Sequence, residues 1–123
     1  MPIIRHAEAP VFTLPGLTVT GLASPTRGAV ETCVWRIALA PGAPGVPHAV
    51  TREEVFVALS GSAQATVAGV LHELRPGDAL LVPAGAELAL ANAAAEPFEA
   101  IVSFPVGGQA VTPEGTFTPP WAE

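Results

Sequence analysis

Lysine and tyrosine are missing from this 123-residue chain, which carries five arginines and three histidines. Without a lysine amine the protein has no group that could form a Schiff base with a carbonyl substrate. Without tyrosine it has no phenol to act as an acid or a base. The net charge of -6 argues against nucleic acid as a partner, because phosphate binding needs a basic surface. Chemistry is therefore left to the histidines, eleven carboxylates, the arginines, hydroxyl groups and one thiol.

That thiol belongs to Cys33, and a lone cysteine excludes an internal disulfide and a cysteine-cluster metal site. Cys33 lies in an apolar run, so we expect it to be buried and unreactive. Long hydrophobic runs are also missing, and no stretch of about 18 uncharged apolar residues predicts a membrane span. Residues 1–10 contain Arg5, His6 and Glu8 and lack the apolar centre of a secretory signal, which predicts a cytoplasmic protein.

Proline and glycine are abundant, with fourteen and twelve copies, and they separate short runs rich in Val, Leu, Ile, Phe and Thr. This pattern is typical of an all-β sandwich or barrel. The length predicts a single domain over residues 1–123, with an extended Pro-rich tail at 112–123 that Trp121 docks onto the surface. A helix over 84–95 is disfavoured because prolines and a glycine bracket it. We expect strands at 18–22, 31–39, 54–59, 63–67, 70–74, 79–82, 87–91 and 98–104, with turns at 60–61, 68–69 and 76–78.

Alternation assigns the faces of these strands. Within 31–39, the odd-numbered residues from Cys33 to Leu39 share one apolar face. The runs at 55–59 and 79–82 are apolar on both faces, which indicates that they lie between two layers or are covered by another subunit. With a mean hydropathy of +0.47, the chain is predicted to form a homodimer, by sheet packing or by exchange of the N-terminal strand at 18–22.

A spaced motif begins at Gly42. Five residues later comes His48, and Val50 follows after one further residue. Glu54 follows after three more residues, and Gly61 after another six. The spacing is similar to the first motif of the cupin superfamily, G-x5-H-x-H-x3-4-E-x6-G, with valine in place of its second histidine.

A second motif begins at Gly77, followed in register by Pro83, Gly85 and Asn92. It resembles the second cupin motif, G-x5-P-x-G-x2-H-x3-N, with Leu88 in place of the histidine. The chain is therefore identified as similar to small single-domain cupins of the cupin type-2 kind, over about residues 30–106. The resemblance implies a double-stranded β-helix, or jelly-roll barrel.

In cupins that bind metal, three imidazoles and one carboxylate point into the barrel and bind Fe, Mn, Ni, Zn or Cu. Carried over position by position, this implies only His48 and Glu54 as ligands, because Val50 and Leu88 offer aliphatic carbon. Catalytic sites generally use at least three protein ligands, so we expect a degenerate metal site and no metal cofactor. A divalent transition metal held by His48 and Glu54 stays open as the alternative. The histidines at positions 6 and 72 are expected in solvent.

The pair His48 and Glu54 has two readings. Glu54 could simply satisfy His48, since a buried carboxylate must be bonded or neutralised. Alternatively, apolar surroundings could perturb the protonation of Glu54 in a functional pocket. The neighbouring Arg52 and Glu53 are expected at the surface.

Three functions compete. The favoured one is binding of a small apolar or aromatic ligand inside the barrel, oriented by His48 and Glu54. The second is a metal-dependent cupin enzyme of the dioxygenase or isomerase type, with a reduced shell of His48 and Glu54. The third is a metal-free enzyme with Glu54 as general base and His48 as acid. The expected pocket residues are Trp35, His48, Val50, Glu54, Phe56, Leu88, Phe98 and Phe104.

Overall fold

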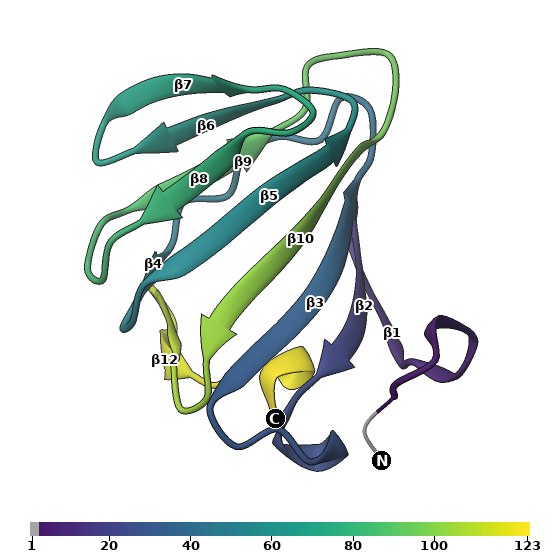
Figure 1. The fold of residues 1–123 in the computed structure, drawn as a ribbon. Coiled ribbons are helices and arrows are strands. Elements are labelled where there is room, and N and C mark those ends of the chain that lie inside the picture. The colour runs from purple at the N-terminus through teal and green to yellow at the C-terminus, as the bar shows by residue number, and fades with distance from the viewer. Residues whose placement is uncertain (1–2) are drawn as a thin grey trace.

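The computed structural model describes residues 3–123 as antiparallel β-strands and three short 3-10 turns (Figure 1). The largest sheet places side by side β1 (Val11–Leu14), β2 (Leu17–Ala23), β3 (Thr32–Leu39), β10 (Phe98–Pro105), β5 (Glu54–Ser60) and β8 (Ala79–Val82). A second sheet is formed by β7 (Val70–Leu74), β6 (Ala63–Val67) and β9 (Leu88–Ala91). A third contains β12 (Gly115–Phe117), β11 (Ala110–Thr112) and β4 (Ala49–Val50). The turns are η1 (His6–Glu8), η2 (Pro25–Arg27) and η3 (Pro120–Ala122).

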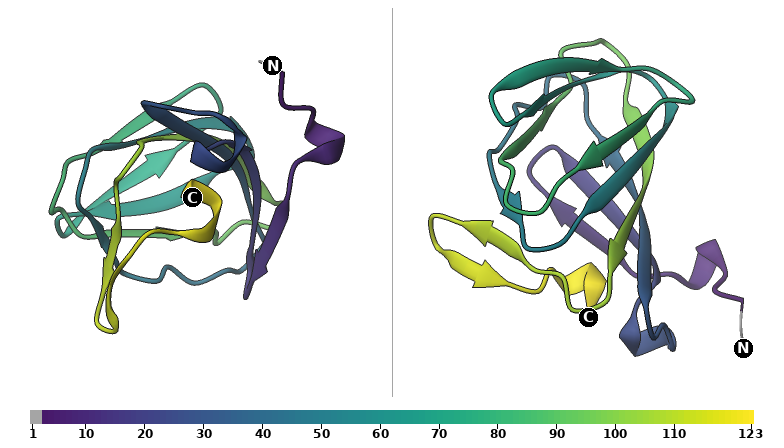
Figure 2. Two further views of the ribbon diagram at one scale, coloured as in Figure 1. Left: turned by 90° about the horizontal axis from the view of Figure 1, so that it is seen from below. Right: turned by 60° about the vertical axis from the view of Figure 1, so that its left-hand side comes forward.

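The three sheets curve around a common interior. Seen from below in Figure 2, the strands form a ring, and the C-terminal end of the chain lies inside it. The all-β prediction is confirmed. Across residues 3–123, no helix is long and apolar enough to cross a membrane.

The core follows from the alternation of apolar residues. In β3, Cys33, Trp35, Ile37 and Leu39 are buried, while the residues between them are only half-buried, as predicted. β10 pairs with β3 and shows the same alternation, with Phe98, Ala100, Val102 and Phe104 buried. Side chains on a strand point alternately to opposite faces, so β3 and β10 together supply one continuous wall of the interior.

All eight predicted strands are present, with ends that differ by at most one residue. The structure adds four short strands that the sequence reading missed: β1, β4, β11 and β12. Each has two to four residues, which is too short for a period of two to stand out. Residues 84–95 form no helix, and β9 lies within them.

Gly61 shows why the first motif ends in glycine. It has a φ of +74° in the turn between β5 and β6. A Cβ added there would lie 2.2 Å from the carbonyl oxygen of Pro97. Both the left-handed backbone and the close approach therefore require glycine, and they hold the β5–β6 turn against the start of β10.

The tail departs from the extended path that we expected. It pairs β11 with β12 and with β4, and it then turns back through η3. Trp121 packs edge-on against Phe12 and Trp35, with ring centroids 5.9 and 6.3 Å away. The expected docking of Trp121 is confirmed, and it brings the C-terminus back to the barrel.

Candidate functional site

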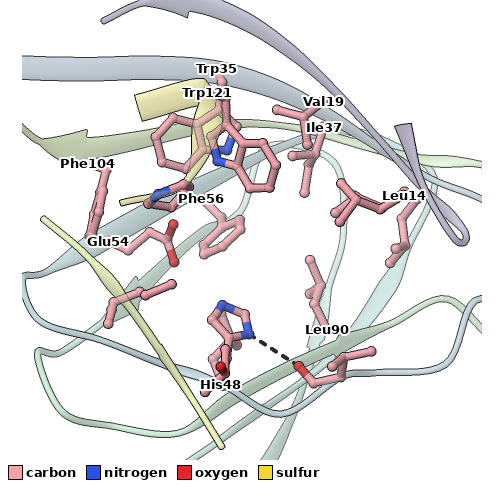
Figure 3. A pocket seen from close by; sticks show the side chains of 18 of the residues that line it. Leu14, Val19, Trp35, Ile37, His48, Glu54, Phe56, Leu90, Phe104 and Trp121 are labelled. Carbon is pink, nitrogen blue, oxygen red and sulfur yellow. Dashed lines mark hydrogen bonds between the residues drawn. The ribbon is translucent and has the colours of Figure 1, made fainter. Parts of the chain in front are cut away.

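A cavity of about 370 Å³ occupies the inside of the barrel (Figure 3). It lies within the size range of small-molecule pockets, roughly 300–1,000 Å³. Among residues 3–123, three lining side chains carry an acid, an imidazole or a hydroxyl group, namely Glu54, His48 and Thr112. The other lining residues are apolar or indole-bearing: Leu14, Pro15, Leu17, Val19, Trp35, Ile37, Leu39, Pro44, Val46, Val50, Phe56, Leu88, Leu90, Phe104, Ala110, Phe117, Pro119 and Trp121.

The two motifs meet through backbone hydrogen bonds. The His48 N–H donates to the Leu88 carbonyl at 3.0 Å, and the Leu88 N–H donates to the His48 carbonyl at 2.7 Å. The Gly85 N–H donates to the Val50 carbonyl at 2.8 Å. Residues paired in this way lie directly opposite each other, which brings the side chains of His48 and Leu88 to one part of the cavity. Val50, two residues beyond His48, lines the same cavity.

Glu54 enters the cavity from the first position of β5, where it pairs with Val82 of β8. It is only 5% exposed, and its Oε1 atom is buried without a hydrogen-bond partner among the described residues. Burial raises the pKa of Glu54 to about 7, because the apolar surroundings disfavour the carboxylate. At neutral pH a large share of Glu54 is therefore an uncharged carboxylic acid.

His48 is held by a different contact. Its Nδ1 lies 3.2 Å from the carbonyl oxygen of Val46. A carbonyl only accepts, so Nδ1 is the donor and the neutral ring leaves its lone pair on Nε2. In Figure 3, this second nitrogen lies on the side of the ring that faces Glu54. No hydrogen bond joins the two side chains within residues 3–123, so the reading in which Glu54 satisfies His48 is wrong.

Seven of the eight expected pocket residues line the cavity, and Phe98 does not. Phe98 is fully buried and faces inward, like Phe104 on the same strand. It lies six residues from Phe104, or about 20 Å along an extended strand. Phe98 therefore fills the core near the turn at Gly61, away from the lined volume. Whether the cavity binds a ligand stays a prediction.

Many of the missed lining residues come from the two ends of the chain, and others, such as Ile37, Leu39 and Leu90, come from strands of the barrel. Leu14 and Pro15 come from the N-terminal hairpin, and Phe117, Pro119 and Trp121 come from the tail. Among those from the chain ends, only Trp121 gave a signal in the sequence, as a large aromatic side chain in a Pro-rich tail. The rest of these depend on the path of the chain ends, which local patterns do not contain. Ile37 and Leu39 had a signal of their own, because they share the apolar face of Trp35 in the predicted strand at 31–39.

The remaining candidates lie away from the cavity. Arg52 and Glu53 are exposed, as expected, and so are His6 and His72. Cys33 is fully buried, its Sγ lies 3.7 Å from the Ala122 carbonyl, and burial raises the pKa of its thiol. A protonated, buried thiol is a poor nucleophile, in line with the inert role expected for Cys33.

The donor set does not fit a transition-metal centre. Val50 and Leu88 line the cavity beside His48 and Glu54, and aliphatic carbons donate nothing to a metal. In the part of the chain that the structure describes, no cluster of three or more His, Cys, Asp or Glu could hold a metal ion. That the protein works without a metal remains a prediction.

Comparison with known proteins identifies the family. The cupin domain profile matches residues 35–104, and no curated protein gives a significant match. The polyketide cyclase RemF from Streptomyces resistomycificus superimposes with a TM-score of 0.77 at 19% identity, over 85% of this chain and 79% of RemF. An RmlC-like cupin from Shewanella frigidimarina gives 0.73 at 21% identity, over 85% and 90% of the two chains. Salicylate 1,2-dioxygenase from Pseudoaminobacter salicylatoxidans, solved with gentisate, gives 0.66 at 21% identity, over 76% and 26%. The identities are low, so these structures bear on the fold alone, but the profile spans more than half of the sequence, and the chain belongs to the cupin superfamily.

Proposed function

We propose that this protein binds a small, uncharged, largely apolar or aromatic molecule inside its barrel. The observation that carries the proposal is the unpartnered Oε1 of Glu54 in an apolar cavity of about 370 Å³. A buried polar atom without a partner costs stability, on the order of 1–3 kcal/mol. Such a group does not stabilise the fold, but it can fix the orientation of a ligand that hydrogen-bonds to it.

The charge of the lining supports an uncharged ligand. No arginine of the described residues lines the cavity, and the sequence contains no lysine. A buried phosphate or carboxylate needs a cation or several hydrogen-bond donors to replace its hydration. This lining offers one imidazole, one hydroxyl, two indoles and a carboxyl group that is itself acidic. An anionic ligand would therefore be excluded.

The aromatic lining supports a planar ligand. Trp35, Phe56, Phe104, Phe117 and Trp121 surround the cavity, and aromatic rings favour edge-to-face and offset contacts with other rings. A related fold also accommodates a ring, since the salicylate 1,2-dioxygenase was solved with gentisate. That ligand carries a carboxylate, which this cavity does not match, so the analogy extends only to the aromatic ring.

The alternative, a metal-dependent dioxygenase or isomerase, is less well supported. It would rest on His48 and Glu54 as the only donors at the ligand positions. Two protein ligands are fewer than the three that catalytic metal sites generally use. We therefore favour the binding protein.

The test uses two probes with the same ring system and different charge, 2-naphthol and 2-naphthoate. Isothermal titration calorimetry should detect binding of 2-naphthol to the wild-type protein and at least tenfold weaker binding of 2-naphthoate. Leu90→Trp places a large side chain in the cavity and should weaken 2-naphthol binding at least tenfold. Leu71→Trp is the matched control, because Leu71 is 66% exposed on β7 and does not line the cavity.

Failure of 2-naphthol to bind would overturn the proposal, and so would unchanged binding in Leu90→Trp. Equal affinity for 2-naphthoate would overturn the requirement for an uncharged ligand. Leu71→Trp should bind as the wild type does.

A further inference from the structure

We propose that His48 and Glu54 form a base–acid pair that interconverts a ketone or aldehyde and its enol in the cavity, without a metal ion. This inference rests on the proposed function, since the carbonyl compound must first bind as a small uncharged ligand. It also reverses the roles expected from the sequence, in which Glu54 was the base and His48 the acid. The reversal follows from how the fold holds each group.

The hydrogen bond of the His48 imidazole leaves its basic nitrogen directed into the cavity. The Val46 carbonyl accepts from Nδ1 at 3.2 Å, so in the neutral ring the free lone pair lies on Nε2. Figure 3 shows Nε2 on the side of the ring that faces Glu54. A backbone carbonyl that fixes the tautomer is the usual way in which a protein orients a catalytic imidazole. His48 is thus prepared to accept a proton from a ligand in the cavity, and not from its own neighbours.

The carboxyl group is suited to the opposite role. Glu54 is nine-tenths or more buried, and its Oε1 has no partner among residues 3–123. Burial raises its pKa to about 7, so it holds a proton that it can donate. A carboxylic acid kept neutral in an apolar site can stabilise the oxygen of a developing enolate. His48 is the only other titratable side chain that lines the cavity in the described part of the chain.

The two groups converge on one volume. Both line the same cavity, and in Figure 3 the carboxyl group of Glu54 and the ring of His48 point toward each other across it. In a ketone the acidic C–H and the carbonyl oxygen are on adjacent carbons, so a base and an acid on two sides of one small pocket can reach both. Among the described residues that line the cavity there is no arginine, so Glu54 is the acid available to protonate the enolate oxygen.

Enolisation moves one proton from carbon to His48 and one proton from Glu54 to oxygen. Nε2 of His48 takes the proton on the carbon beside the carbonyl, and that C–H electron pair becomes the new C=C bond. The carbonyl π electrons form an O–H bond with the proton from Glu54. The products are the enol, an imidazolium and a carboxylate. The reverse step restores both groups and the ketone, and in heavy water it returns deuterium to carbon after the imidazolium has exchanged its proton.

The probe is 2-tetralone, which is uncharged, bicyclic and aromatic and has exchangeable C–H groups beside its carbonyl. Proton NMR in heavy water would follow loss of those C–H signals with and without the protein, and calorimetry on the same samples would measure binding. We expect the wild type to accelerate exchange with saturation kinetics. His48→Gln and Glu54→Gln should each bind 2-tetralone within about threefold of wild type but lose roughly 100-fold or more of the catalysed rate.

His72→Gln and Glu53→Gln are the matched controls, because both residues are exposed and neither lines the cavity. They should exchange 2-tetralone at the wild-type rate. The wild-type rate should also fall above about pH 7, as Glu54 loses its proton, and Glu54→Gln should show no such fall in its residual rate.

The outcomes separate the two proposals. If neither 2-tetralone nor 2-naphthol binds, both the binding function and this inference are wrong. If 2-naphthol binds and 2-tetralone does not, the binding function stands and this inference is wrong. If 2-tetralone binds and exchange is not accelerated, the binding function stands and the enolisation is wrong. Acceleration that survives in both His48→Gln and Glu54→Gln would also overturn the assignment of the pair.

Discussion

Glu54 shows how one buried side chain links stability to pH. The pKa of a glutamic acid in an unfolded chain is about 4.3, and burial raises that of Glu54 to about 7. Between these values the unfolded chain loses a proton that the folded protein keeps. Stability is therefore highest below about pH 4.3, falls as the pH rises toward 7 and is constant above that, as far as this group is concerned. The loss is on the order of 3 kcal/mol.

Glu54→Gln removes this titration and keeps the shape of the side chain. We expect urea unfolding between pH 4.5 and 8 to show a flatter dependence for this variant, with the wild type less stable than the variant near pH 8. Glu53→Gln removes an exposed carboxylate one position away and should keep the wild-type slope. Parallel curves for wild type and Glu54→Gln would show that Glu54 is not held neutral.

Substitutions at Val50 and Leu88 can test whether the four metal-ligand positions of the two motifs point into one part of the cavity. Both line the cavity with His48 and Glu54, so Val50→His with Leu88→His should rebuild a shell of three imidazoles and one carboxylate. Two buried imidazoles should lower the melting temperature without metal. Ni or Zn binds only the folded shell and should restore stability, by about 2.7 kcal/mol at a concentration 100 times the dissociation constant.

Val50→His with Leu90→His is the matched control, because Leu90 lines the same cavity but is not at a ligand position. Melting after chelation, with and without metal, should show a smaller gain for this variant and for the wild type. An equal gain in all three proteins would mean that the four positions do not form one shell.

At the scale of elements, the C-terminal turn η3 closes the barrel. Trp121 packs against Phe12 and Trp35, the Cys33 Sγ approaches the Ala122 carbonyl, and the Thr26 N–H donates to the Glu123 carbonyl at 3.2 Å. These contacts cover Cys33, the single thiol of the chain. The reactivity of that thiol therefore reports whether η3 is docked.

Trp121→Ala should lower stability by about 2 kcal/mol, from lost apolar burial and aromatic contact, and should speed the reaction of Cys33 with a thiol reagent. Phe117→Ala is the control, since Phe117 also belongs to the tail and lines the cavity but is half-exposed on β12. Equal thiol reactivity in wild type and Trp121→Ala would show that η3 does not protect Cys33.

Some strands and pocket residues of this protein can be predicted from its sequence, and others cannot. The buried face of β3 follows from alternation, β5 and β10 follow from apolar runs between turn residues, and the motif spacing places His48, Val50, Glu54 and Leu88 on one interior. Alternation gives the face of a side chain but not its height along the barrel, which is why Phe98 was wrongly assigned to the pocket. The path of the tail could not be predicted, because β11 pairs with β4, about 60 residues earlier in the chain. Such a pairing leaves no local periodicity.

At the scale of the whole molecule, the outer face of the large sheet is apolar where β10, β5 and β8 lie side by side. Register places Val55 beside Leu81 and Val57 beside both Ala79 and Ile101. Of these, Val57 is 39% and Leu81 is 62% exposed. The half-exposed ion pair of Arg36 and Glu99 borders this face, with its N–O distance of 3.0 Å. We call this surface the outer patch: Val55, Val57, Ala79, Leu81 and Ile101.

The outer patch is suited to a second copy of the same chain. A two-fold axis places identical surfaces against each other, so the apolar centre and the charged border of one copy would each contact the same patch on the second copy. Residues 18–22, which the sequence analysis named for strand exchange, form part of β2, and β2 pairs on both sides with β1 and β3 of its own chain. Exchange would have to break these pairs first, whereas sheet packing uses the outer patch as it stands. Packing of sheet on sheet is therefore the route that we propose.

We expect light scattering at micromolar concentration to give twice the mass of one 12.5 kDa chain. Leu81→Lys puts a charge at the centre of the outer patch, where a two-fold dimer would bring two lysines together in an apolar setting, and it should yield the monomer. Leu71→Lys adds the same charge at an equally exposed leucine on β7 and should leave the dimer intact. Both substitutions are at exposed positions, so circular dichroism should show the same fold for all three proteins. A monomeric wild type would refute the dimer. A dimeric Leu81→Lys would show that the dimer interface lies on another face than the outer patch.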